Sequence, residues 1–170
     1  CEIPAYLPVR AKRVGVFVNE SQETILMYAD RFALDYIQLH GSESPGYCRS
    51  LRSSGLHLIK AFSISQSKDL ATVSAYKGLC DYYLFDAKTS LYGGSGNQFD
   101  WNLLHRYSGM TPFLLSGGIN PYSIKAIREF HHPKLAGIDI NSRFETAPGQ
   151  KDVERIGKFL QAIRTGETAG

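Results

Sequence analysis

The sequence has few of the features that mark secreted, membrane-spanning or nucleic-acid-binding proteins. Its 170 residues include three cysteines, an odd number at spacings that match no zinc site and no secreted disulfide framework. No stretch reaches about 18 uninterrupted apolar residues, and the first residues lack the charged and apolar regions of a signal peptide. Nineteen Lys and Arg are scattered among sixteen Asp and Glu, without a basic stripe. We therefore expect a cytoplasmic protein with no membrane or nucleic-acid partner.

The composition itself is that of a globular domain. Hydrophobic residues make up 43% of the chain and charged residues 21%, which excludes a disordered protein. A chain of this length buries about two-thirds of its unfolded surface without the help of disulfides or metals. We expect residues 1–170 to form one domain. Because the sequence opens on Cys1 rather than Met, we also expect residue 1 to lie inside a longer natural chain.

Short apolar runs alternate with longer segments of helical period, which predicts a parallel sheet with helical crossovers. Successive runs begin roughly 20 to 30 residues apart, the length of one strand, one helix and two loops. The predicted strands are Val14–Val18, Tyr36–His40, His57–Phe62, Tyr82–Phe85, Pro112–Leu115 and Ala136–Ile140. The predicted helices are Gln22–Phe32, Pro45–Ser53, Lys68–Tyr76, Trp101–Tyr107, Tyr122–Phe130 and Val153–Ile163.

Two folds have this alternation, an open doubly wound sheet and a closed (β/α)8 barrel of the TIM type. The open fold usually carries a glycine-rich turn after its first strand, and Val18-Asn19-Glu20-Ser21 has no glycine. Glycine-rich and polar residues follow the fourth, fifth and sixth predicted strands instead. This distribution favours the barrel, in which loops at the carboxyl ends of many strands build one site.

Two consecutive strands are followed by residues suited to hold a phosphate group. Gly117 and Gly118 stand between a strand and a helix start, where backbone N–H groups attract anions. Asn141 and Ser142 follow the next strand and offer side-chain donors. The glycines alone also suit a plain tight turn that needs their backbone freedom. Having both features on consecutive strands favours a phosphorylated ligand.

Asp86 stands at the carboxyl end of the fourth predicted strand. In a barrel, a carboxyl group at this position points into the mouth, where partial burial lets it serve as a general acid. Alternatively, Asp86 caps the loop or pairs with Lys88. The long loop that follows suits a flap over a ligand, although such loops also occur without function. The core of this loop is Gly93, Gly94, Ser95 and Gly96.

The second predicted strand places Gln38 and His40 on one face, directly before a glycine. We assign both to the substrate pocket, although a histidine at a strand end is more often structural. Cys48 and Cys80 lie away from the carboxyl ends of the strands, and we expect both to be buried packing residues.

In order and spacing, these strand-end residues resemble the phosphoribosylanthranilate isomerase family of tryptophan biosynthesis. The resemblance runs from about Val14 to the last helix and depends on the combination of motifs. The motifs are Gln38-Leu39-His40-Gly41, Asp86-Ala87-Lys88-Thr89 with Gly93-Gly94-Ser95-Gly96, Phe99-Asp100-Trp101, and Leu115-Ser116-Gly117-Gly118-Ile119-Asn120-Pro121.

The resemblance implies a (β/α)8 barrel and an Amadori rearrangement without cofactor or metal. The substrate would be N-(5-phosphoribosyl)anthranilate and the product 1-(2-carboxyphenylamino)-1-deoxyribulose 5-phosphate. Asp86 matches the family's general acid. The family's phosphate contacts carry over onto Gly117, Gly118, Asn141 and Ser142. Family members are monomers, homodimers or fusions, so we expect a monomer or a homodimer.

The sequence departs from the family at two places. Asn141-Ser142-Arg143 replaces the Ser-Ser-Gly of many members, which leaves the exact phosphate donors there open. The family's general base is a cysteine in a Lys-x-Cys-Gly motif on the first strand, and Cys1-Glu2-Ile3-Pro4 does not match it. The sequence has six predicted strands, whereas the family's barrel has eight, and Val14–Val18 aligns with the family's third strand. This predicts an N-terminally incomplete barrel that lacks the first two βα units. The base is then expected upstream of residue 1, and the 170-residue chain alone is expected to be inactive.

Two alternatives remain at this point. One is another phosphate-binding barrel enzyme, such as an indoleglycerol-phosphate synthase or a sugar-phosphate epimerase. A synthase would need a lysine and glutamate set on its strands, where Lys60 is the only lysine, and an epimerase would need a metal-binding His and Asp cluster, which is not evident. The other alternative is a non-catalytic sensor of a phosphorylated ligand.

Overall fold

The computed structural model describes residues 11–87 and 101–165, and the predicted flap residues Gly93, Gly94, Ser95 and Gly96 lie outside them, as does Cys1. Within the described residues, six parallel strands form one sheet in chain order, as the alternation predicts. The strands are β1 (Val14–Phe17), β2 (Tyr36–Leu39), β3 (Leu58–Ile64), β4 (Tyr82–Ala87), β5 (Phe113–Ser116) and β6 (Leu135–Ile138). Sequential parallel pairing with a helical segment between strands is the arrangement of a β/α barrel.

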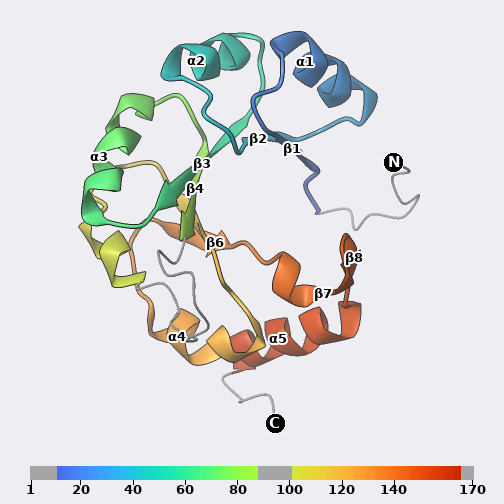
Figure 1. Ribbon diagram of the computed structural model, residues 1–170, viewed down its shortest axis with the longest axis vertical. Coiled ribbons are helices and arrows are strands. Elements are labelled where there is room, and N and C mark those ends of the chain that lie inside the picture. Colours follow the sequence, from blue (N-terminus) through green and yellow to red (C-terminus); the bar gives the residue numbers. More distant parts are fainter. Residues whose placement is uncertain (1–10, 88–100, 166–170) are drawn as a thin grey trace.

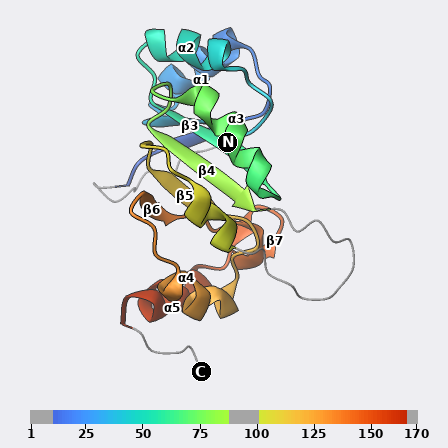
Figure 2. The same ribbon diagram turned by 90° about the vertical axis from the view of Figure 1, so that its left-hand side faces the viewer.

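The helices lie outside the curved sheet and follow it around in chain order (Figure 1). Helices α1 (Gln22–Arg31) and α2 (Pro45–Ser53) begin where their caps predict, because Ser21 accepts a hydrogen bond from Thr24 N–H and Ser44 accepts one from Tyr47 N–H. Helices α4 (Ile124–Glu129) and α5 (Val153–Thr165) pack against each other at the opposite end of the molecule (Figure 2). None of the helices in the described parts is long and apolar enough to cross a membrane.

Three of the six predicted helices take a tighter form than predicted. The segment predicted as Lys68–Tyr76 is a short helix α3 (Leu70–Val73) between the 3-10 turns η1 (Ser67–Asp69) and η2 (Ser74–Tyr76). Thr72 and Ser74 hydroxyls donate to the carbonyl oxygens three residues earlier, at 2.8 Å each, and such bonds compete with regular helix. Likewise, Trp101–Arg106 is the 3-10 helix η3, and the 3-10 turn η4 (Pro121–Ser123) precedes α4.

A small antiparallel hairpin after β6 is absent from the predicted elements. It follows the 3-10 turn η5 (Ser142–Phe144) and pairs β7 (Glu145–Ala147) with β8 (Gln150–Lys151). The turn between them contains Pro148 and Gly149. The φ of Gly149 is +79°, in the left-handed region that glycine tolerates. The predicted last strand, Ala136–Ile140, is also displaced and ends two residues earlier.

The sheet separates two apolar layers. Between the sheet and the helices lies the larger core, which includes Leu39, Phe62, Phe85 and Phe113. On the inner face, Ile59, Ala61 and Leu84 form a smaller cluster against Tyr36, Tyr82 and Leu114. Alternation along each strand therefore sends one set of side chains to the helices and the other to the interior of the barrel.

Among the described residues, β1 and β6 form the two ends of the sheet and are not paired with each other. Val14, Val16 and Val18 alternate with Phe17, which packs on the helix-side core, and are exposed by 42%, 59% and 63%. The inner face of β1 is thus apolar and uncovered by the described chain.

Candidate active site

Strands β2 and β4 bring three predicted site residues together at their carboxyl ends. Gln38, His40 and Asp86 occupy the same inner face as Tyr36 and Leu84, which follows from the two-residue period of a strand. Gln38 Nε2 donates to His40 Nδ1 at 3.0 Å, and His40 Nε2 lies 3.8 Å from Asp86 Oδ2. Since Nδ1 accepts a hydrogen bond, the neutral imidazole carries its proton on Nε2, the nitrogen that faces Asp86.

A cavity of about 280 Å³ opens at this edge of the sheet, between the ends of β2, β3 and β4. His40 and Asp86 line it together with Ser63, Thr72 and Tyr76. The side chain of Asp86 is 23% exposed and that of His40 is 34% exposed. A half-buried carboxyl group and an imidazole in one cavity can exchange protons with a bound molecule.

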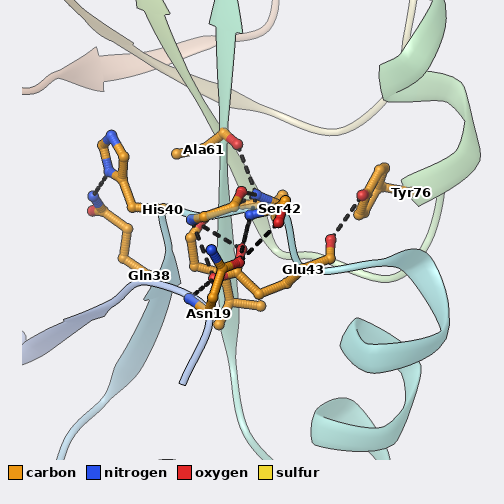
Figure 3. Close-up of polar contacts among 10 residues, drawn as sticks. Asn19, Gln38, His40, Ser42, Glu43, Ala61 and Tyr76 are labelled. Carbon is orange, nitrogen blue, oxygen red and sulfur yellow. Dashed lines mark hydrogen bonds and ion pairs between the residues drawn. The ribbon is translucent and has the colours of Figure 1, made fainter. Parts of the chain in front are cut away.

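The turn that follows His40 is fixed by a buried ion pair, which the sequence analysis did not foresee. Glu43 Oε2 lies 3.1 Å from Lys60 Nζ, and each side chain is only 3% exposed. Burial raises the pKa of the Glu43 carboxyl, but the backbone N–H of Asn19 and the Lys60 ammonium outweigh this effect and hold the pKa below its usual value. Figure 3 shows this network beside the Gln38–His40 pair.

Tyr76 anchors the same turn from the helix side of the sheet. Its hydroxyl donates to the carbonyl oxygen of Glu43 at 2.8 Å, and its ring meets Phe62 edge-on at 5.0 Å between centroids. Burial raises the pKa of this hydroxyl. Tyr76 is therefore a neutral hydrogen-bond donor at ordinary pH.

The glycines predicted to hold phosphate follow β5, next to the strand that carries Asp86. Gly117 and Gly118 have φ values of +84° and +70°, which a residue with a Cβ rarely adopts. Just before them, Ser116 Oγ donates to Asp139 Oδ2 at 2.8 Å and joins the ends of β5 and β6. In the register, Ser116 is opposite Asp86, so the glycine turn and the carboxyl group share one edge of the sheet.

Asn141 and Ser142 follow β6 at this same edge and are exposed. The Asn141 side-chain oxygen accepts a hydrogen bond from Lys151 Nζ, which also pairs with Glu145 Oε1 at 2.6 Å. Lys151 comes from the hairpin strand β8 and adds a positive charge beside the predicted phosphate donors. The Pro148-Gly149 turn was the sequence signal for this hairpin.

The two described cysteines, Cys48 and Cys80, are buried in the helix-side core, as predicted. They are 0% and 6% exposed, and neither lines the cavity. Neither thiol is placed to act on a molecule held beside Asp86.

The fold and the edge that gathers Asp86, His40 and the glycine turn define the class of β/α-barrel enzymes, whose sites lie at the carboxyl ends of the strands. Residues 5–162 match the family model for N-(5'phosphoribosyl)anthranilate (PRA) isomerase. The chain belongs to this family, which confirms the resemblance.

Relatives and solved structures agree with this assignment. The N-(5'-phosphoribosyl)anthranilate isomerase of Phocaeicola vulgatus is 52% identical over 161 residues, which cover 95% of this chain and 78% of that protein. The crystal structure of phosphoribosyl anthranilate isomerase from Thermotoga maritima superposes with a TM-score of 0.81 at 36% identity, over 93% of this chain and 75% of that one. A second solved isomerase, in complex with reduced 1-(o-carboxyphenylamino)-1-deoxyribulose 5-phosphate, has a TM-score of 0.78 at 32% identity, over 93% and 74% of the two chains.

Proposed function

We propose that this chain carries the acid and phosphate side of a phosphoribosylanthranilate isomerase active site. The reaction is the Amadori rearrangement of N-(5-phosphoribosyl)anthranilate to 1-(2-carboxyphenylamino)-1-deoxyribulose 5-phosphate, in tryptophan biosynthesis. The observation that carries the proposal is the position of Asp86, half-buried in the cavity beside His40 at the carboxyl edge of the sheet. The substrate that we assign to this carboxyl group follows from the family to which the chain belongs.

Asp86 is the general acid in this proposal. It donates a proton to the ring oxygen of the ribose as the ring opens to a Schiff base. The Nε2–H of His40 faces the Asp86 carboxyl group at 3.8 Å. A base then removes a proton from the neighbouring ribose carbon. The enolamine so formed gains a proton at the carbon that bears the nitrogen and loses one from its hydroxyl group, which gives the ketone of the product. The rearrangement is an isomerisation, so atoms and electrons balance within the substrate and no cofactor is required.

The phosphate group of the substrate is assigned to the ends of β5 and β6. Gly117 and Gly118 offer backbone N–H groups there, and Asn141 and Ser142 offer side-chain donors. The amide nitrogen of Asn141 stays available because Lys151 engages the side-chain oxygen. The Lys151 ammonium is shared between the Asn141 oxygen and the Glu145 carboxylate, and it fixes the direction of the Asn141 amide.

By analogy with the family's Lys-x-Cys-Gly motif, the general base is assigned to a cysteine upstream of residue 1. The two described cysteines, Cys48 and Cys80, are buried on the helix side of the sheet. The exposed inner face of β1 supports a barrel completed by further strands, since Val14, Val16 and Val18 would then be covered. We expect a cytoplasmic enzyme that acts as a monomer or homodimer. One solved structure is of monomers generated from the dimeric isomerase of Thermotoga maritima, so both forms are known for that family member.

The synthase alternative is disfavoured by the environment of Lys60. Its ammonium is 3% exposed and is engaged by Glu43 and by three carbonyl oxygens. A lysine held in this way is not free to act as the catalytic amine of a synthase.

The test is the loss of substrate fluorescence on incubation of the full-length gene product with phosphoribosylanthranilate. Asp86→Asn is expected to lower kcat by about 10²- to 10⁴-fold, the range for removal of a general acid. Asp30→Asn, an exposed carboxyl group on α1, is the matched control and is expected to be neutral. The 170-residue chain alone is expected to bind without turnover. An Asp86→Asn enzyme within twofold of the parent would refute the assignment of the acid.

A further inference from the structure

The charged pair Glu43–Lys60 is buried more deeply than Asp86 and His40, and the proposed reaction does not use it. Both side chains are 3% exposed, against 23% for Asp86 and 34% for His40. Removal of two charges from water has a large desolvation cost, which is offset only where good geometry and further hydrogen bonds satisfy both groups. A well-packed apolar pair at such a position is often as stable. The pair therefore calls for an explanation other than stability.

The contacts of the pair converge on the backbone around His40. Lys60 Nζ donates to the carbonyl oxygens of Leu39 at 3.2 Å and Gly41 at 2.8 Å, the residues directly before and after His40. The Glu43 carboxylate accepts from the N–H of Gly41 at 3.0 Å and of Asn19 at 2.8 Å. Both peptide groups that flank His40 are thus held by one charged pair.

The backbone of His40 has a further fixed point. Its N–H donates to the carbonyl oxygen of Phe17 on β1 at 2.8 Å. From this anchored backbone the imidazole extends away from the ion pair and meets Gln38 (Figure 3). Its Nε2 faces Asp86. The direction of the imidazole therefore depends on the position of the peptide groups that Glu43 and Lys60 hold.

We propose that Glu43 and Lys60 are positioning residues that hold the His40 imidazole, with its Nε2–H, toward Asp86. The expected effect on kcat rests on the proposed function, whereas the expected effect on the His40 tautomer does not. A misplacement of about 1 Å in a reacting group can lower a rate by about 10²-fold. We therefore expect loss of the pair to lower kcat by about 10- to 100-fold, with KM within about twofold.

The first experiment reads the imidazole directly and needs no activity. In ¹⁵N NMR spectra of histidine-labelled protein, His40 of the parent chain is expected to show one tautomer, with the proton on Nε2. Glu43→Gln keeps the shape and an acceptor oxygen but removes the charge, and is expected to raise the other tautomer to about a tenth or more. Asp35→Asn removes one partner of the exposed Lys12–Asp35 pair and is the control that leaves His40 unchanged. An unchanged tautomer in folded Glu43→Gln protein overturns the proposal.

The second experiment is a double-mutant cycle for kcat in the full-length gene product, with Glu43→Gln and His40→Asn. If the pair acts through His40, Glu43→Gln is expected to change kcat less than twofold in the His40→Asn background. Losses that multiply would overturn the link to the imidazole. The variant Glu43→Met with Lys60→Met removes both charges at similar volume and repeats the cycle if Glu43→Gln does not fold. A full-length product without isomerase turnover contradicts the proposed function, and the NMR result then decides the positioning role by itself.

Discussion

Replacement of Gly41 by alanine is a sharp test of how tightly the turn after β2 is packed. The φ of Gly41 lies outside the left-handed region, so alanine is compatible with its backbone and only space is at issue. A Cβ at this position would lie 2.7 Å from Glu43 Oε1, and Asn19 Oδ1 would be closer still. At such distances, at least one of the two oxygens must move.

Both of these oxygens accept hydrogen bonds that hold the turn. Glu43 Oε1 accepts from Asn19 N–H at 2.8 Å, and Asn19 Oδ1 accepts from Ser42 N–H at 2.7 Å. Overpacking of this kind costs about 1–3 kcal/mol. Weakening one hydrogen bond to a charged group costs about 1.5–3 kcal/mol more. We expect Gly41→Ala to lower the free energy of unfolding by about 2.5–6 kcal/mol in total.

Urea unfolding followed by far-UV circular dichroism measures this change through the midpoint and the m-value. The matched control is Gly157→Ala in the middle of α5, where the added Cβ would meet no heavy atom of the described residues within 4 Å apart from its chain neighbours and the helix's own backbone. It is expected to raise the free energy of unfolding by about 0.5–1 kcal/mol, because alanine is the better helix former. A Gly41→Ala variant within about 0.5 kcal/mol of the parent, at an unchanged m-value, would refute the packing argument.

Two further predictions concern pH and the inner face of the sheet. Burial of Asp81 opposes its ionisation, but the Leu58 N–H at 2.8 Å and the His57 side chain outweigh this and hold the pKa of Asp81 below the ordinary value of 3.8. The unfolded chain then binds more protons than the folded protein in this range, so stability is present above pH 3.8 and is lost as the pH falls through the lower folded pKa. The urea midpoint should fall as the pH is lowered from about 6 to about 3, and it should fall less in Asp81→Asn than in the parent. An equal fall of the midpoint in the two proteins would contradict this prediction. In the 170-residue chain, Leu84→Ala, at a fully buried inner position, should cost about 2–5 kcal/mol, and Val16→Thr on the exposed face of β1 less than about 0.5 kcal/mol. Similar losses in these two variants, measured by the same unfolding assay, would contradict the described exposure of β1.

The predicted strands and the first two helices agree closely with the structure, because their signals are local. Apolar alternation defines the strands, and Ser21 and Ser44 each cap a helix that begins at the next residue. The segment around Thr72 and the Trp101 segment were less predictable. Both segments have the apolar spacing of a regular helix. In the Thr72 segment, hydroxyl-to-carbonyl bonds compete with the regular helix, and they are not visible in that spacing.

In the candidate site, too, some features could be predicted from the sequence and others could not. The sequence places Gln38, His40, Asp86 and the glycine pair at strand ends, and parallel strands bring their carboxyl ends to one edge, so this grouping could be predicted. Lys151 could not be assigned to it, because Lys151 lies ten residues beyond Asn141 and returns to this edge only through the hairpin.

By itself, the sequence determined the order of strands and helices, the edge that carries the site and the family motifs, since each depends on residues near one another in the chain. Only the tertiary structure decided which partner each side chain meets. Glu43 and Lys60 are distant in sequence and ordinary in type, and they become a buried pair around His40 because β2 and β3 lie side by side. The contacts of a charged group depend on strand register and burial, which no local pattern encodes.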